Sequence, residues 1–180
     1  MTYNFKKCGK NVRISPKASI YGAHNIEIGD NVRIDDFCIL SASKSIIIGS
    51  HIHIACYSCL IGHELIQLED CCGVSMKVVI LSSSDDYSGN SLVGPVYGDF
   101  CKVNHAPVIL KTCSVIGAGS VVLPGVTLGV GAAVATQSLV KKDVADFHMV
   151  GGIPAKFLFY RSKNILKIKD NFITLMRGDP

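Results

Sequence analysis

A six-residue spacing of apolar side chains constrains the fold of this chain more than any other feature. Ile28, Ile34 and Leu40 are six residues apart, and the same spacing recurs along the chain. An amphipathic helix repeats near every 3.6 residues and an ordinary strand every second residue, so neither explains the pattern. A period of six predicts a short strand, a turn and the next strand, with three such units closing a triangular coil. The series comprises Cys8, Ile14, Ile20; Ile28, Ile34, Leu40; Ile48, Ile54, Leu60; Leu68, Val74, Ile80; and Leu110, Ile116, Val122, Leu128, Val134, Val140.

The distance between coils predicts where the chain is interrupted. The first apolar positions of four successive coils are Cys8, Ile28, Ile48 and Leu68, which are 20 residues apart, whereas Leu110 and Leu128 are 18 apart. The two additional residues always follow the third apolar position of a coil, so the insertions stack on one corner of a prism. The largest insertion, residues 82–106, falls on that corner too. Long loops without regular structure are usually functional in compact domains.

Small residues and glycines fit this triangular coil. Small side chains two positions before an apolar residue suit a narrow interior corner, and turn glycines permit a positive φ or a close approach of two backbones. The small positions are Cys38, Ser58, Cys72, Ser114, Ser120 and Ser138. The turn glycines are Gly9, Gly29, Gly49, Gly117 and Gly129.

The C-terminal region departs from the repeat. The coils are predicted to end near Val144, and residues 151–154 form a turn. Residues 162–176 are predicted to form a helix with Ser162 as its N-cap and one apolar stripe, which would cover an open end of the prism. The stripe consists of Ile165, Ile168, Phe172 and Leu175. We therefore divide the chain into residues 1–160, a β-helix domain with the inserted loop 82–106, and residues 161–180, a C-terminal helix and tail.

Composition excludes several classes of protein. With 48% apolar and 18% charged residues the chain is not disordered. A net charge of +4 is too small and dispersed to indicate nucleic-acid binding. No apolar run has the length of a bilayer span and no signal segment begins the chain, so we predict a cytoplasmic protein without a membrane partner. The eight cysteines are accordingly expected to be reduced thiols, and the Cys56–Cys59 spacing lacks a second pair that would complete a metal site.

Three motifs resemble those of a known family. Residues 116–126 (IGAGSVVLPGV), 139–144 (LVKKDV) and 151–156 (GGIPAK), together with the repeat, resemble the hexapeptide-repeat acyltransferases over nearly the whole chain. The resemblance implies an all-β fold, the left-handed parallel β-helix, and a homotrimer with acetyl-CoA as donor and active sites between subunits. Residues 83–89 and 105–108 resemble a narrower subgroup of this family. Members of that subgroup occur in pathways that make surface polysaccharides (O-antigen, capsule, lipopolysaccharide). That similarity implies N-acetylation of a nucleotide-linked amino sugar such as dTDP-4-amino-4,6-dideoxyglucose, or alternatively O-acetylation of a galactoside or polysaccharide hydroxyl.

Candidate catalytic residues lie on the insertion corner. Galactoside acetyltransferases of this fold carry a histidine inside the loop, whereas here the first histidine is His105 at the far end of the loop. We predict His105 as the general base and His63, one coil away, as its competitor. The substrate-binding candidates are the loop residues Ser84, Asp85, Asp86 and Tyr87. Asp85 and Asp86 would bind the sugar or orient the base. Transfer to an amine depends less on a general base than transfer to a hydroxyl does.

Coenzyme A is expected along the later coils. Glycines and small residues would line the pantetheine arm, and basic residues would meet the phosphates. The small set is Gly117, Ala118, Gly119, Ala135 and Thr136; the set near the phosphates is Lys141, Lys142, Pro154, Lys156 and Arg161. The same fold hosts zinc enzymes with three histidines, but His51 and His53 suit a surface strand and nothing fixes a third ligand. We therefore predict no metal.

Overall fold

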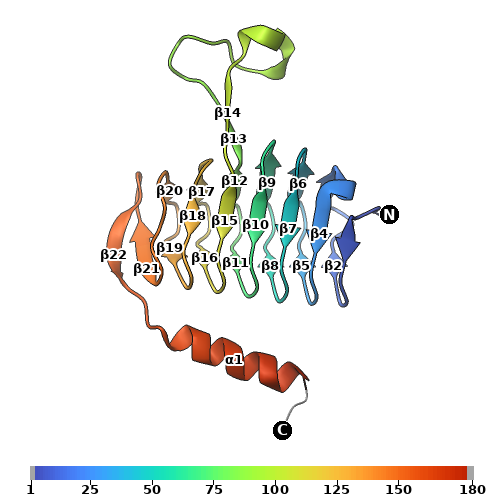
Figure 1. Ribbon diagram of the computed structural model, residues 1–180, viewed down its shortest axis with the longest axis vertical. Helices are drawn as coiled ribbons and strands as arrows, with labels where there is room; N and C mark the ends of the chain where they lie inside the picture. Colours follow the sequence, from blue (N-terminus) through green and yellow to red (C-terminus); the bar gives the residue numbers. More distant parts are fainter. Residues whose placement is uncertain (1–2, 178–180) are drawn as a thin grey trace.

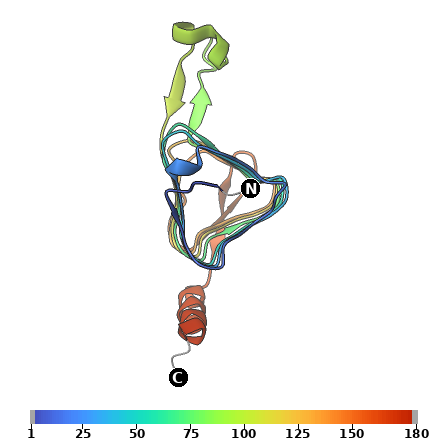
Figure 2. The ribbon, with the colours of Figure 1, turned by 90° about the vertical axis from the view of Figure 1, so that its right-hand side faces the viewer.

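The computed structural model describes residues 3–177, and its short strands wind into a triangular prism (Figures 1 and 2). Each of the three faces is a sheet of parallel strands, except that the last strand of the second sheet is antiparallel. The first sheet contains β1 (Lys7–Cys8), β4 (Ile26–Ile28), β7 (Ile46–Ile48), β10 (Ile66–Leu68), β15 (Val108–Leu110) and β18 (Thr127–Leu128). The second contains β2 (Arg13–Ile14), β5 (Arg33–Ile34), β8 (His53–Ile54), β11 (Gly73–Val74), β16 (Val115–Ile116), β19 (Ala133–Val134), β21 (His148–Gly151) and β22 (Lys156–Tyr160). The third contains β3 (Ser19–Tyr21), β6 (Ile39–Ala42), β9 (Cys59–Gly62), β12 (Val79–Leu81), β17 (Val121–Val122) and β20 (Leu139–Val140).

The register of the first sheet confirms the predicted repeat. Ile28 pairs with Ile48, Ile48 with Leu68, Leu68 with Leu110, and Leu110 with Leu128. Because a slip of one residue would turn every inward side chain outward, the apolar spacing fixes this register. The prism is therefore the fold that the sequence predicts.

The core is a column of stacked aliphatic side chains inside the prism. Ile48, Leu68 and Leu110 are at most 1% exposed. The predicted small positions are buried as well, and their polar atoms are bonded: Ser58 Oγ donates to the Ser75 carbonyl oxygen at 2.9 Å, and Ser120 Oγ donates to that of Ala135 at 2.8 Å. These short side chains thus fill the interior corner without leaving an unbonded polar atom.

The turn glycines serve close approach rather than a positive φ. A Cβ on Gly29 would lie 2.7 Å from the carbonyl carbon of Gly49 in the next coil, and φ of Gly29 is not positive. The left-handed residue of the same turn is Asn31, with a φ of 56°. The sequence offered two reasons for these glycines, a positive φ and a close approach of two backbones. Only the close approach applies.

The inserted segment has regular structure of its own, contrary to the predicted loop. β13 (Ser83–Asp85) and β14 (Val103–His105) form an antiparallel hairpin, with the 3-10 helix η2 (Pro95–Phe100) toward its tip. The hairpin projects away from the prism (Figure 2). It leaves the prism where the third sheet passes into the first, which we call the hairpin corner. The short 3-10 helix η1 (Ala23–Asn25) lies at the same corner.

The C-terminal region differs from two predictions. The coils continue past Val144, because β21 pairs in parallel with β19 before β22 returns antiparallel to it. Helix α1 (Asn164–Arg177) begins two residues after Ser162, whose Oγ accepts a 3.2 Å hydrogen bond from the Asn164 backbone N–H.

Helix α1 does not cover an end of the prism. It runs along the corner between the first and second sheets (Figure 1), which we call the helix corner, where Phe172 meets the His51 ring edge-on at 5.2 Å between centroids. Half-buried Ile165 faces the prism, whereas Ile168 is 55% and Leu175 78% exposed. The predicted stripe is therefore only partly buried by its own chain. Within residues 3–177 we find no helix long and apolar enough to cross a membrane.

Candidate active site

The two predicted base candidates meet at the root of the hairpin. Ser83 and His105 pair directly across β13 and β14, and Ser83 Oγ lies 2.8 Å from His105 Nδ1. The His63 backbone N–H donates to the same Ser83 Oγ at 2.7 Å, and the rings of His63 and His105 are 5.4 Å apart. When Nδ1–H of His105 donates to Ser83, its Nε2 carries the lone pair that a general base needs. Sequence reasoning did not single out Ser83 in this role, although it follows His63 by one coil period.

A carboxylate lies beside this group. Glu64 Oε1 forms an ion pair with Lys44 Nζ at 2.5 Å, and Ser82 Oγ donates to the Glu64 carbonyl oxygen at 2.9 Å. The hydrogen bond from Lys44 holds the pKa of Glu64 below its ordinary value, with a smaller contribution from His105. Glu64 therefore stays ionised next to the histidines.

The predicted orientation of the base by Asp85 or Asp86 is wrong. Asp86 caps the hairpin's own turn, because its Oδ1 accepts from the Ser88 backbone N–H at 2.8 Å and its Oδ2 from Ser88 Oγ at 3.0 Å. These hydrogen bonds lower the pKa of Asp86. Asp85 pairs with Val103, two residue pairs beyond Ser83 on the same side of the hairpin and about 7 Å away along the strand.

The other loop candidates are separated from the histidines. Ser84 pairs with Asn104 on the opposite side of the hairpin, and Tyr87 is 79% exposed farther out. The partner that holds His105 is thus the Ser83 hydroxyl. A sugar contact by residues 84–87 remains a prediction.

The small residues predicted to line coenzyme A are stacked on neighbouring coils. Gly117 N–H donates to the Val134 carbonyl oxygen at 2.8 Å, and Gln137 N–H to that of Ala118 at 2.8 Å. They lie where the second sheet passes into the third, which we call the third corner. A Cβ on Gly117 would lie 2.6 Å from the Thr136 backbone nitrogen, so the fold itself requires this glycine. The contact of residues 117–119, 135 and 136 with coenzyme A remains a prediction.

The residues predicted to lie near the phosphates of coenzyme A are brought together, except for Arg161. Lys141, Lys142, Pro154 and Lys156 line a single cavity of about 570 Å³ at the C-terminal end of the prism. Arg161 lies elsewhere, because its Nη1 donates to the carbonyl oxygens of Gly131 at 2.5 Å and of Ala132 at 3.3 Å. Arg161 thereby ties the start of the C-terminal segment to the helix corner rather than joining the lysines.

Comparison with known proteins identifies the family. No family model matches the chain, but over 177 residues it is 44% identical to the dTDP-4-amino-4,6-dideoxy-D-glucose acyltransferase of Escherichia coli, covering 97% of this chain and 92% of that protein. The chain belongs to the hexapeptide-repeat acyltransferases. It is therefore an enzyme of acyl transfer, and its prism is the left-handed parallel β-helix of that family.

Solved structures agree with this assignment. AntD, an N-acyltransferase from Bacillus cereus, has a TM-score of 0.93 and 41% identity in its complex with dTDP and 3-hydroxybutyryl-CoA, covering 96% of this chain and 92% of AntD. A variant of AntD was solved with dTDP-4-amino-4,6-dideoxyglucose and coenzyme A, at a TM-score of 0.91 and 41% identity over 94% of this chain and 91% of AntD. A hexapeptide-repeat acetyltransferase of Vibrio cholerae, 21% identical over 88% of this chain and 73% of that one with a TM-score of 0.60, shares the fold.

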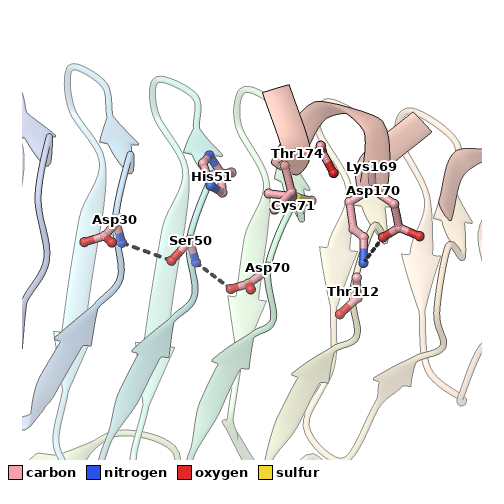
Figure 3. Close-up of a pocket in the computed structure, with 10 residues that line it drawn as sticks. Asp30, Ser50, His51, Asp70, Cys71, Thr112, Lys169, Asp170 and Thr174 are labelled. Atoms are coloured by element: carbon pink, nitrogen blue, oxygen red, sulfur yellow. Dashed lines mark hydrogen bonds and ion pairs between the residues drawn. The ribbon is translucent and has the colours of Figure 1, made fainter. Parts of the chain in front are cut away.

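A second hollow of this acyltransferase, about 540 Å³, lies between helix α1 and the helix corner (Figure 3). Its polar side chains connect successive coils: Ser50 Oγ accepts from the Asp30 backbone N–H at 3.1 Å, and Asp70 Oδ1 from that of Ser50 at 2.7 Å. The eight cysteines, Cys71 in this hollow among them, are free thiols as predicted. These polar groups hold successive coils together, whereas the predicted base candidates lie at the hairpin corner.

Proposed function

We propose that this chain is a cytoplasmic, acetyl-CoA-dependent N-acetyltransferase whose acceptor is a nucleotide-linked amino sugar, dTDP-4-amino-4,6-dideoxyglucose, made for a surface polysaccharide such as an O-antigen, a capsule or lipopolysaccharide. One observation carries the proposal: relatives named for this acyl transfer, or solved with this sugar nucleotide and coenzyme A, match almost the whole chain in sequence and in structure. The match includes the hairpin segment and is not confined to the repeat that all members of the fold share.

A homotrimer is supported by apolar side chains that a single chain leaves exposed. On the hairpin, Val96 is 83% and Phe100 75% exposed, and on helix α1 Leu175 is 78% exposed. Exposed apolar patches of this kind mark interaction sites. Neighbouring copies of the chain would cover them, and the hairpin of one copy would then complete the active site of the next.

The donor would be held by the small residues of the third corner and by the lysines of the C-terminal cavity. In this arrangement Lys141, Lys142 and Lys156 meet the phosphates of coenzyme A at the C-terminal cavity, and residues 117–119 and 135–136 face the pantetheine arm. The residues proposed to hold the donor are glycine, alanine, threonine, proline and lysine, and the proposed reaction needs no metal ion.

The reaction is a direct transfer. The sugar amine attacks the thioester carbonyl carbon, a proton leaves the nitrogen, and the C–S bond breaks to release the thiol of coenzyme A. His105, held by Ser83 and neighboured by His63, would accept that proton when the hairpin root lies beside the acceptor. Because a neutral amine is already a nucleophile, losing His105 should slow amine transfer modestly but abolish transfer to a hydroxyl.

The deciding experiment measures thiol release from acetyl-CoA with two acceptors, dTDP-4-amino-4,6-dideoxyglucose and a simple galactoside. We expect turnover with the amino sugar alone, a loss of about tenfold in His105→Ala, and no loss in the matched variant His24→Gln, whose side chain is exposed on η1. Turnover with the galactoside alone, abolished in His105→Ala, would establish the O-acetyltransferase instead. Silence with both acceptors would refute the proposed function.

A further inference from the structure

The surplus positive charge of the chain is concentrated on its first coil. Residues 3–26 contain five lysine and arginine side chains and no aspartate or glutamate, whereas the whole chain has 18 basic and 14 acidic side chains. The rest of the chain is therefore close to neutral. The five basic residues are Lys6, Lys7, Lys10, Arg13 and Lys17, and all of them are exposed. The fold thus gathers in one layer a charge that is small when it is averaged over the chain.

This layer is one end of the prism. β1, β2 and β3 are the outermost strands of the three sheets, and each has a neighbouring strand on one side only. They lie at the end of the prism opposite β22 (Figure 1). Lys7 lies on β1 and Arg13 on β2, with Lys10 in the turn between them, and Lys17 precedes β3. The basic residues therefore surround the end of the prism, and we call residues 3–21 the basic end.

Two of the five basic side chains form ion pairs with the second coil. Lys6 Nζ is 2.8 Å from Glu27 Oε1, and Lys17 Nζ is 3.0 Å from Asp36 Oδ2. The side chains of Lys6 and Lys17 nevertheless remain 61% and 60% exposed. Ion pairs this exposed to water are weak, so an external anion can compete for both lysines.

The other three basic side chains have no acidic partner. Among residues 3–177, no carboxylate forms an ion pair with Lys7, Lys10 or Arg13. The remaining acidic residues of the second coil, Asp30 and Asp35, lie one strand spacing, about 4.8 Å, farther from the end of the prism. A surface that approaches the basic end therefore meets the positive layer before the negative one.

The centre of the basic end is apolar. A hollow of about 410 Å³ opens there, and its lining includes two aromatic and two aliphatic side chains. They are Tyr3, Phe5, Val12 and Ile14. The two aliphatic residues are half-buried, whereas their equivalents one coil farther on, Val32 and Ile34, are at most 1% exposed. The first coil thus combines a basic rim with an apolar centre that no further coil covers among residues 3–177.

A flat anionic surface matches this arrangement better than a strand of nucleic acid does. A nucleic acid presents its phosphates in lines, which a ring of cations around an apolar centre cannot follow. An anionic bilayer presents headgroups over a plane, and each lysine or arginine near it strengthens binding about fivefold. Aromatic rings favour the boundary between headgroups and hydrocarbon. A second copy of the basic end is disfavoured by the repulsion of like charges.

We propose that the basic end is a membrane-attachment surface that binds the anionic headgroups of a phospholipid bilayer. The inference goes beyond the proposed function. The predicted absence of a membrane partner rested on the lack of a spanning segment, and attachment to the surface needs no such segment. In a homotrimer, equivalent ends of the three copies lie at the same height along the three-fold axis, so three basic ends would engage one bilayer together. That multiplication alone rests on the proposed function.

Co-sedimentation of the full-length protein with vesicles tests the attachment. Vesicles of phosphatidylcholine alone are compared with vesicles of phosphatidylcholine and phosphatidylglycerol in equal parts. We expect binding to the anionic vesicles only, in about 0.1 M salt, and its loss in about 1 M salt, where the Debye length falls to about 3 Å. The triple variant Lys7→Glu, Lys10→Glu and Arg13→Glu should bind the anionic vesicles at least about 100-fold more weakly.

A second triple variant provides the matched control. Lys77→Glu, Lys111→Glu and Lys167→Glu make the same change in net charge at exposed positions away from the basic end. This variant should bind anionic vesicles within about threefold of wild type, because its charges lie farther from the bilayer than a Debye length. Both triple variants should retain the wild-type melting temperature and the wild-type kcat with substrates in solution.

A tryptophan reporter tests which part of the molecule meets the bilayer. The chain contains no tryptophan, so Tyr3→Trp supplies a single one beside Phe5, whose ring lies 5.5 Å from that of Tyr3. Its fluorescence should shift to shorter wavelength when anionic vesicles are added. Tyr57→Trp, at a side chain that is 52% exposed between β8 and β9, should not respond. A response at position 57 and none at position 3 would overturn attachment through the basic end.

Three further outcomes would overturn the proposal: equal binding to both kinds of vesicle, equal losses in the two triple variants, or tighter binding of DNA than of anionic vesicles in the same salt. Attachment and activity are measured separately. A protein that binds anionic vesicles but acetylates no acceptor would refute the proposed function and support the membrane surface. An active enzyme that binds no vesicle would refute the membrane surface and leave the proposed function intact.

Discussion

The prism and the hairpin differ in the exposure of their apolar side chains. In the prism Ile48, Leu68 and Leu110 are at most 1% exposed, because each stacks on its equivalents in the coils above and below. On the hairpin Val96 and Phe100 are 83% and 75% exposed. The apolar side chains of the prism are therefore buried within one chain, whereas those of the hairpin are left uncovered by it.

The largest effect that separates the two regions should come from side-chain truncation. Leu68→Ala leaves a cavity in a fully buried column and should lower the free energy of unfolding by about 2–5 kcal/mol at every protein concentration. Phe100→Ala should lower it only where the assembled protein is populated, because in the proposed trimer its exposed ring would be covered by another copy. Urea denaturation at several protein concentrations distinguishes the two. A loss in Phe100→Ala that does not vary with concentration would show that the hairpin is stabilised within its own chain.

The repeat made the prism predictable, because every inward position recurs and a single register satisfies all of them. The course of helix α1 could not be predicted in the same way. Its apolar stripe indicates one buried side but not which surface buries it, and its direction depends on Arg161 binding two carbonyl oxygens about 30 residues away in the sequence. A pattern along one segment carries no information about such a contact.

A smaller effect should show that the glycines of the prism differ in how tightly the neighbouring coil packs against them. Gly29→Ala places a methyl group against the backbone of the next coil and should cost about 1–3 kcal/mol, because two coils must separate. Gly73→Ala meets only the movable side chain of Val115 and should change the free energy of unfolding by less than about 1 kcal/mol. Thermal unfolding of the two variants compares them directly. Equal losses would mean that the fold needs a glycine at position 73 as much as it does at position 29.

The candidate site was predictable to the extent that insertions share a corner. Counting residues placed His63 and His105 together, and their rings lie 5.4 Å apart. The partner of His105 was misassigned to the carboxylates, because the choice between Ser83 and Asp85 depends on which rung of the hairpin faces the histidine. Away from the site, the pairing of His53 with Asp35 was missed for a related reason: it joins side chains 18 residues apart whose directions the spacing alone does not give.

The smallest of these effects is a loss of stability at alkaline pH that arises from a thiol buried inside the prism. Burial raises the pKa of the Cys72 thiol from its ordinary 9.0 to about 12. Below pH 9 the thiol is protonated in both the folded and the unfolded chain and stability is unaffected. Above pH 9 only the unfolded chain ionises, so stability falls as the pH rises toward 12, by about 1.4 kcal/mol per pH unit at most.

Cys72→Ser provides the matched variant, because Ser58, Ser114, Ser120 and Ser138 already occupy equivalent positions in other coils. Urea unfolding at pH 8 and pH 10 should show that wild type loses roughly 1 kcal/mol more than Cys72→Ser over this interval. Cys8→Ser, which removes an exposed thiol, should behave as wild type does. If Cys72→Ser and wild type lost the same stability, the thiol would have to ionise inside the folded prism, and water would then reach an interior corner that the stacked coils otherwise close.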